Sequence, residues 1–256
     1  MPYVEVRGMQ LYYEAQGRGE PLLCLPGALG TGRTDFGPQL AGLAAHLQVI
    51  APDPRGYGQS RPPRRDFPLD FFQRDAEDMA ALMTALGHPT FNVAGWSDGA
   101  NSALLLALTY PERVARLIVW GGNARVLAED IARFERVRDL STWSPRMRES
   151  LEAIYGEELQ ALWHAWCDAM QAIFHAGGEI CSQRLHLIRC PTFVLHGAQD
   201  PMVPAVHPQL LQARIPQAHL HVFPAGKHNI HLRYAEAFNQ LVLAFLQETP
   251  AAVPLA

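Results

Sequence analysis

The sequence offers little that would bind nucleic acid or insert into a membrane. Its 256 residues carry 21 Lys and Arg against 25 Asp and Glu, for a formal net charge of −4, and Lys227 is the only lysine. That balance implies no basic face for a phosphate backbone. No apolar run approaches the roughly 18 residues that a membrane-spanning helix needs. We therefore expect neither a nucleic-acid partner nor a membrane partner.

Cysteine is also scarce, and its spacing is uninformative. The four cysteines, Cys24, Cys167, Cys181 and Cys190, are not closely paired and do not have the spacing of a metal site. The chain begins directly with alternating strand-like residues, without a charged and then apolar leader. We expect buried thiols in a reducing compartment, and hence a cytoplasmic protein.

What the chain does have is an alternation of strand-like and helix-like segments. Hydrophobic residues make up 48% of it and charged residues 18%, as in an ordinary globular protein. Apolar strand-like runs occur at Leu22–Leu25, Val49–Ala51, Phe91–Ala94, Val114–Trp120, Thr192–His196 and His219–Phe223. The alternation predicts an α/β fold with a mostly parallel central sheet flanked by helices.

The expected domain organisation is one core with one helical insertion. The pattern between residues 124 and 187 is helical throughout, which predicts a cap over the strand ends. Residues 1–123 and 188–248 would form the core, and 249–256 a loose tail. Smaller elements are expected as a hairpin from Pro2–Val6 and Leu11–Gln16, and as helices near Gln39–His46 and Leu232–Gln247.

The most informative stretch is Gly95-Trp96-Ser97-Asp98-Gly99. It follows an apolar strand and opens an apolar helix, so it predicts a sharp strand–turn–helix corner that exposes the Ser97 hydroxyl. The glycines are expected where a side chain would collide with neighbouring backbone. The alternative is a serine that only caps the helix.

A serine hydroxyl needs a base, and the base needs an orienting acid. His228 follows the last expected strand and Asp200 follows the one before it. The chain order Ser97, Asp200, His228 is that of α/β hydrolases. His231 is a rival base, although its place in the final helix would hold it away from the corner. Asp53 is a rival acid, but we expect it to lock its Asp-Pro-Arg-Gly turn through an ion pair.

Two backbone N–H groups must stabilise the oxyanion that forms when a serine attacks a carbonyl. One is expected from Asp98, and the other from Ala28 or Leu29 in the glycine-rich loop after Leu25, unless that loop is a plain turn. The Asp98 carboxylate would oppose the oxyanion charge by roughly 3 kcal/mol at ~5 Å and an effective dielectric of 20. A substrate ammonium would offset this repulsion; alternatively, Asp98 only complements the helix dipole.

Several motifs together resemble one family, the biphenyl hydrolase-like or valacyclovir hydrolase family of α/β hydrolases. They are the serine corner, Asp53-Pro54-Arg55-Gly56-Tyr57-Gly58, Gly226-Lys227-His228-Asn229-Ile230-His231-Leu232-Arg233, Thr34-Asp35-Phe36-Gly37-Pro38-Gln39-Leu40 and Asp66-Phe67-Pro68. The resemblance runs from about Leu22 to Leu246. It diverges most between residues 124 and 187.

The resemblance implies an α/β-hydrolase fold and cleavage of α-amino acid esters by Ser97, Asp200 and His228. It implies that Asp98 binds the substrate amine and that Leu29, rather than Ala28, supplies the second oxyanion donor. It also places three residues at the floor of an apolar acyl pocket: Trp120, Gly121 and Gly122.

The sequence thus predicts a serine esterase that acts on α-amino acid esters, with water as second substrate and without cofactor or metal. A metal site from His219, His221, His228 and His231 is disfavoured because no acidic or cysteine ligand completes it. Carboxylesterase, carbon–carbon hydrolase or perhydrolase chemistry remains open, as does a ligand receptor with negligible turnover. A monomer is compatible with the sequence.

Overall fold

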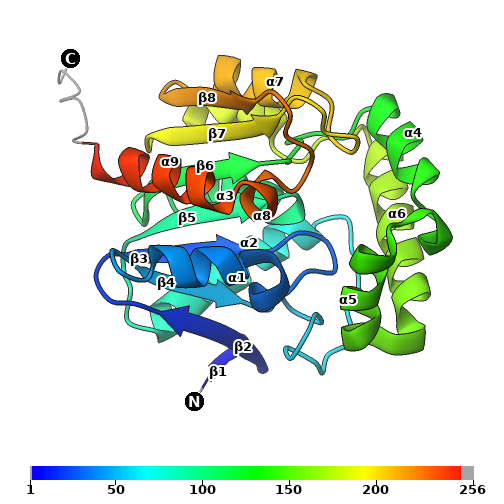
Figure 1. The fold of residues 1–256 in the computed structure, drawn as a ribbon, viewed down its shortest axis with the longest axis horizontal. Coiled ribbons are helices and arrows are strands. Elements are labelled where there is room, and N and C mark those ends of the chain that lie inside the picture. The colour runs from blue at the N-terminus through cyan, green and yellow to red at the C-terminus, as the bar shows by residue number, and fades with distance from the viewer. Residues whose placement is uncertain (1, 249–256) are drawn as a thin grey trace.

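The computed structural model describes residues 2–248, with only the backbone at 146 and 147, and is built on one twisted sheet (Figure 1). The predicted tail, 249–256, lies outside the described residues. The strand order is β1-β2-β4-β3-β5-β6-β7-β8, antiparallel at β1, β2 and β4 and parallel from β4 to β8. The strands are β1 (Tyr3–Val6), β2 (Met9–Gln16), β3 (Pro21–Leu25), β4 (Gln48–Pro52), β5 (Phe91–Trp96), β6 (Val114–Trp120), β7 (Thr192–Gly197) and β8 (Ala218–Phe223). The predicted mostly parallel sheet is confirmed.

Helices cover both faces of this sheet. One face carries α1 (Gly32–Leu43), α8 (Ile230–Arg233) and α9 (Ala235–Gln247), and the other carries α2 (Phe71–Ala85), α3 (Asp98–Thr109) and α7 (Val206–Arg214). The inner strands are apolar on both sides, as parallel strands between helices must be. In β3, Leu23 and Leu25 join the core under α2 and α3, while Leu22 and Cys24 join the core under α1 and α9.

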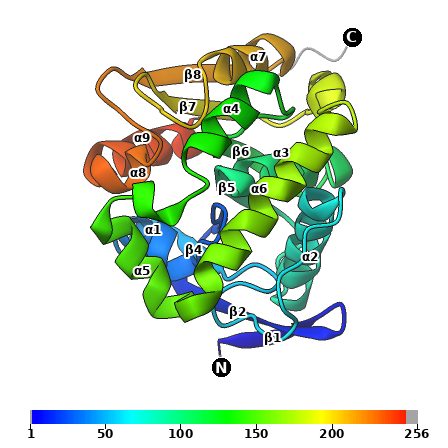
Figure 2. The ribbon, with the colours of Figure 1, turned by 90° about the vertical axis from the view of Figure 1, so that its right-hand side faces the viewer.

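The α-helices between β6 and β7 lie beyond the carboxyl ends of the parallel strands (Figure 1). They are α4 (Ala128–Arg136), α5 (Pro145–Tyr155) and α6 (Leu159–His175), with short 3₁₀ turns at Leu140–Thr142, Gly156–Glu158 and Ser182–Leu187. Figure 2, which faces these helices, shows α6 crossing in front of α3. We propose that residues 124–187 form the cap. Ligands of such sheets bind at these strand ends.

Two of the predicted helices have different boundaries in the structure. Helix α1 begins at Gly32, not near Gln39, because the Thr31 hydroxyl accepts the Thr34 N–H at 3.0 Å and caps the helix earlier. The predicted helix Leu232–Gln247 is interrupted at Tyr234, whose φ of −121° and ψ of 42° are not helical. The short α8 therefore separates His228 and its loop from α9.

The four cysteines are all buried and free, as the sequence predicts. Burial raises the pKa of the Cys190 thiol to about 11 and leaves it protonated at neutral pH. None of the helices within residues 2–248 combines the length and the apolar character needed to cross a membrane.

Candidate active site

Ser97 occupies a strained corner between β5 and α3. Its φ is 56° and its ψ is −119°, a combination that costs a non-glycine residue on the order of 1–3 kcal/mol. A Cβ at Gly95 would lie 2.3 Å from the Gly99 carbonyl oxygen, and one at Gly99 would lie 2.0 Å from the Leu25 carbonyl oxygen. The chain can make this corner only with glycine at both positions, and the corner holds the serine at the start of α3.

His228 and Asp200 form a hydrogen-bonded pair next to this corner. The His228 Nδ1 lies 2.8 Å from Asp200 Oδ2, and the Asp200 side chain is 1% exposed. The other carboxylate oxygen accepts the N–H groups of Met202 and Val203 at 2.8 and 2.9 Å. Burial alone would raise the pKa of Asp200, but the His228 ring and these N–H groups hold it below its ordinary value. An ionised Asp200 fixes the Nδ1–H tautomer of His228, which leaves Nε2 able to accept a proton.

Ser97 and His228 converge on the peptide that joins Trp120 to Gly121. The Ser97 N–H donates to the Trp120 carbonyl at 2.9 Å, and a Cβ at Gly121 would lie 2.8 Å from His228 Cε1. The Trp96 indole N–H, beside the serine in sequence, donates to the His228 carbonyl at 3.0 Å. The three residues predicted as nucleophile, base and acid are therefore brought together from three separate loops.

The rival base, His231, is fully enclosed. Its Nδ1 accepts the Trp120 indole N–H at 3.0 Å, and its ring packs against Phe36 and Trp96. Burial, aided by the His228 charge, lowers the pKa of His231 to about 3. The packed imidazole, uncharged at neutral pH, holds the His228 loop against the core and has no route to act as the base.

Asp53, the rival acid, braces a turn, but without the predicted ion pair. Its two oxygens accept the N–H groups of Gly32 at 2.9 Å and Gln59 at 2.7 Å. Arg55 instead makes a bidentate pair with the buried Asp78 at 2.7 and 2.8 Å. The prediction of an Asp53–Arg55 pair is wrong, because Asp78 on α2, distant in sequence, offers the guanidinium a better-matched partner.

The loop after β3 forms a tight turn with Leu29 in an unusual conformation. The Gly30 N–H donates to the Gly27 carbonyl at 3.1 Å, and Leu29 has a φ of 62°, in the left-handed region that favours glycine. The carboxylate of Asp35 braces the turn by accepting the Gly27 N–H at 3.0 Å. Burial raises the pKa of Asp35 to about 7. The loop is therefore a braced structure rather than a plain glycine turn.

Asp98 is buried beside Ser97 and is held by the cap. The residue is 7% exposed, and its Oδ2 accepts the Trp166 indole N–H from α6 at 2.7 Å. Burial raises the pKa of Asp98 to about 7, while the Trp166 hydrogen bond and the nearby Arg65 charge oppose the rise. The Asp98 carboxyl group therefore keeps its proton to a higher pH than an exposed aspartate does. The sequence does not identify Trp166 as the partner of Asp98, although Trp163 and Trp166 recur at helical spacing.

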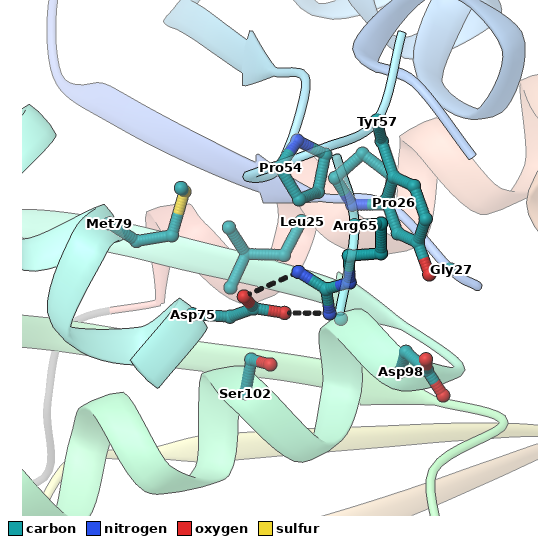
Figure 3. Close-up of a pocket in the computed structure, with 11 residues that line it drawn as sticks. Leu25, Pro26, Gly27, Pro54, Tyr57, Arg65, Asp75, Met79, Asp98 and Ser102 are labelled. Carbon is teal, nitrogen blue, oxygen red and sulfur yellow. Dashed lines mark hydrogen bonds and ion pairs between the residues drawn. The ribbon is translucent and has the colours of Figure 1, made fainter. Parts of the chain in front are cut away.

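A small cavity of about 20 Å³ lies next to Asp98 (Figure 3). Two of its lining residues are paired: the Arg65 guanidinium makes a bidentate pair with Asp75, at 2.8 and 2.6 Å, and the Arg65 side chain is 1% exposed. The Tyr57 ring packs on Arg65 with 4.6 Å between the guanidinium carbon and the ring centre. The Arg65 guanidinium is therefore hydrogen-bonded to Asp75, and it acts on Asp98 only through its charge. Sequence reasoning missed this pair because its members come from a loop and from α2.

The three residues predicted as the pocket floor lie in different surroundings. The Trp120 side chain packs against Phe36 and Phe238 in the core on the opposite side of the sheet, so only its backbone borders the site. Gly121 lies against the His228 ring, whereas a Cβ at Gly122 would meet Ala100 Cβ at 2.7 Å. On the cap side of Asp98, Trp163 and Trp166 stack at 4.6 Å, and Phe134 packs edge-on to Trp166 at 4.9 Å.

Comparison with known proteins agrees with this geometry. The model of the family described as alpha/beta hydrolase fold matches residues 20–175 and 138–233. Serine hydrolase BPHL of Homo sapiens is 46% identical over 248 residues, which cover 95% of this chain and 85% of that protein. A putative carbamate hydrolase, RutD, of Azorhizobium caulinodans is 30% identical over 97% of this chain and 99% of its own length.

A solved structure shows the same fold at lower identity. The 2-hydroxy-6-oxo-6-phenylhexa-2,4-dienoate hydrolase BphD of Rhodococcus sp. strain RHA1 superposes with a TM-score of 0.84 at 19% identity, over 96% of this chain and 98% of that one. With the fold, the serine corner and these relatives in agreement, the chain belongs to the α/β-hydrolase family and is a hydrolase similar to serine hydrolase BPHL.

Proposed function

We propose that this hydrolase is a serine esterase that cleaves α-amino acid esters through an acyl-enzyme. Ser97 attacks the ester carbonyl while His228 Nε2 takes its proton, and Asp200 stabilises the imidazolium that forms. The N–H groups of Leu29 and Asp98 hold the oxyanion. The same imidazole then protonates the leaving alcohol and activates the water that releases the amino acid. The Asp98 carboxylate binds the α-ammonium of the acyl group.

The observation that carries the proposal is the burial of Asp98 beside the nucleophile. An ionised carboxylate here repels the developing oxyanion, and burial already raises its pKa to about 7. A substrate ammonium removes both penalties, because it neutralises the carboxylate and replaces the lost solvent. The neighbouring cation, Arg65, is held by Asp75 in a bidentate pair and leaves that role open. The likeness to serine hydrolase BPHL supports serine-based hydrolysis.

A carboxylesterase acting on neutral acyl groups is the alternative that the apolar cap favours. Trp163, Trp166 and Phe134 would suit a hydrophobic acyl chain equally well with or without an amine. Such an enzyme, however, has no use for a buried carboxylate next to its oxyanion hole. The position of Asp98 therefore favours the amino acid ester.

The test compares matched ester pairs. Ethyl or benzyl esters of valine and phenylalanine are assayed beside the same esters without the amino group, at pH 7.5. We expect kcat/KM to be about tenfold or more higher for the amino esters, which corresponds to at least about 1.4 kcal/mol. The Ser97→Ala variant should lose turnover of both. Equal rates on the two ester types would refute the ammonium role, and a fully active Ser97→Ala variant would refute the nucleophile.

A further inference from the structure

Tyr155, at the end of cap helix α5, directly contacts the turn after β3, which carries the proposed oxyanion donor Leu29. Its hydroxyl donates to the Leu29 carbonyl at 2.8 Å and accepts the Gly58 N–H at 3.2 Å. The residue is 4% exposed. One phenol thus joins three segments that are far apart in sequence: the turn after β3, the loop after β4, and the cap.

The turn needs such support because Leu29 is a leucine in a left-handed conformation, with a φ of 62°. A residue with a Cβ stays in that region only when its surroundings fix it there. Asp35 holds one side of the turn through the Gly27 N–H at 3.0 Å. Tyr155 holds the other side through the Leu29 carbonyl. The peptide between Ala28 and Leu29, which carries the proposed oxyanion donor, lies between these two anchors.

The cap end that bears Tyr155 is itself secured to the core. Arg61 donates to the Ile154 carbonyl at 3.0 Å and to the Gly58 carbonyl at 3.0 Å. Its guanidinium carbon lies 4.9 Å from the centre of the Tyr155 ring. Movement of α5 away from the core would break these contacts together with the hydroxyl bond to Leu29.

We propose that Tyr155 is a positioning residue that holds the Leu29 N–H in its oxyanion-binding orientation, so that the oxyanion hole is complete only when the cap is docked. This inference rests on the proposed role of Leu29 in a serine hydrolase. It assigns to the cap a part in the chemical step, in addition to enclosing the substrate. A Tyr155 substitution should accordingly weaken binding of the transition state more than binding of the ester.

The experiment compares Tyr155→Phe with Ser60→Ala in the full-length enzyme. Ser60 is a matched control because its buried hydroxyl also donates to one carbonyl, that of Asp53 at 2.7 Å, and accepts one N–H, that of Tyr12 at 2.9 Å. Neither partner belongs to the turn that carries Leu29. Both variants should lose thermal stability. Rates are normalised by titrating active serine with a fluorophosphonate, on whichever ester the wild type hydrolyses best.

For Tyr155→Phe we expect kcat to fall about tenfold to a hundredfold and KM to stay within about twofold of the wild-type value. This loss in kcat is no larger than the loss from deleting an oxyanion donor itself. Affinity for a trifluoromethyl ketone analogue, whose hemiketal oxygen occupies the oxyanion hole, should fall in proportion, and affinity for the amino acid product should not. Ser60→Ala should keep both kcat and ketone affinity. An unchanged kcat in Tyr155→Phe, or a rise in KM alone, would overturn the inference.

A milder variant covers the case in which Tyr155→Phe is too unstable to assay. Arg61→Gln weakens the attachment of α5 while leaving the hydroxyl in place, and it should lower kcat and ketone affinity in the same sense by a smaller factor. The outcomes also separate the two proposals. Equal activity on amino and neutral esters would refute the ammonium role and leave the Tyr155 comparison valid. An active Ser97→Ala enzyme would refute both.

Discussion

Replacing Asp98 by asparagine is the sharpest test of how the acyl group is recognised. The substitution keeps the size of the side chain and the backbone N–H, but it removes the charge. For an ammonium at ~4 Å and an effective dielectric of 20, the attraction is about 4 kcal/mol before desolvation. Hydrogen bonds to charged groups contribute about 1.5–3 kcal/mol net. We therefore expect kcat/KM for amino esters to fall about tenfold to a hundredfold and that for neutral esters to stay level or rise.

The pH dependence gives an independent signature of the same carboxylate. Because the pKa of Asp98 is raised to about 7, the group is neutral below that pH and anionic above it. The ratio of kcat/KM for an amino ester to that for its neutral partner should rise as pH increases through about 7. It should fall again as the substrate amine loses its proton, near about 8. Using the ratio cancels the pH effects that the two esters share.

The assay measures both esters from pH 5.5 to 9 with wild type and Asp98→Asn. In the variant the ratio should be low and should no longer rise near pH 7. If Asp98→Asn lowers kcat/KM for the two esters by the same factor, Asp98 acts on the oxyanion or on the fold and not on the amine. If the wild-type ratio does not change between pH 6 and 8, the carboxylate does not titrate in the site as the reasoning requires.

Three further outcomes follow from the same geometry. The pKa of Asp98 is about 7 in the fold against an ordinary 3.8, so the free energy of unfolding of wild type should fall by up to about 4 kcal/mol as pH rises through this window. In chemical unfolding, the stability of Asp98→Asn relative to wild type should therefore increase up to pH 7 and stay constant above it. A constant difference in stability from pH 4 to 8 would contradict this. Trp166→Phe removes the N–H that lowers the pKa of Asp98, so the pH at which the kcat/KM ratio of the two esters rises should move upward. In wild type the Trp163 indole donates to the Val137 carbonyl, so Trp163→Phe should leave that pH unchanged. Gly121→Ala puts a Cβ 2.8 Å from His228 Cε1 at a φ of 65°, so kcat should fall at least about tenfold. Gly37→Ala, which has open space around its Cβ, should keep full activity. Equal activity of the two variants would show that His228 does not lie where the structure places it.

The sequence predicted the parts of this enzyme that depend on local pattern. Apolar runs identified the parallel strands, and the two glycines around Ser97 identified the corner, because each signal lies within a few neighbouring residues. The order of Asp200 and His228 after successive strands was enough to name the pair that the structure joins at 2.8 Å.

What the sequence did not predict depends on contacts between distant segments. The pairing of Arg65 with Asp75, the indole of Trp166 on Asp98 and the hydroxyl of Tyr155 on Leu29 each join residues from different loops and helices. Nothing in the spacing of these residues distinguishes them from ordinary core or surface positions. The early start of α1 was missed for a different reason, because its capping residue Thr31 lies within a glycine-rich run typical of a loop.

The hydrogen bond from Trp166 to Asp98 has a consequence for how substrate range can change during evolution. The Asp98 carboxylate is placed by the Ser97 corner, but the indole that lowers its pKa comes from α6, which lies outside the central sheet. A relative with a different side chain at the position of Trp166 would keep the catalytic machinery and acquire a carboxylate of different proton affinity. New acyl preferences could then arise by exchanging one helix, with the catalytic loops left untouched.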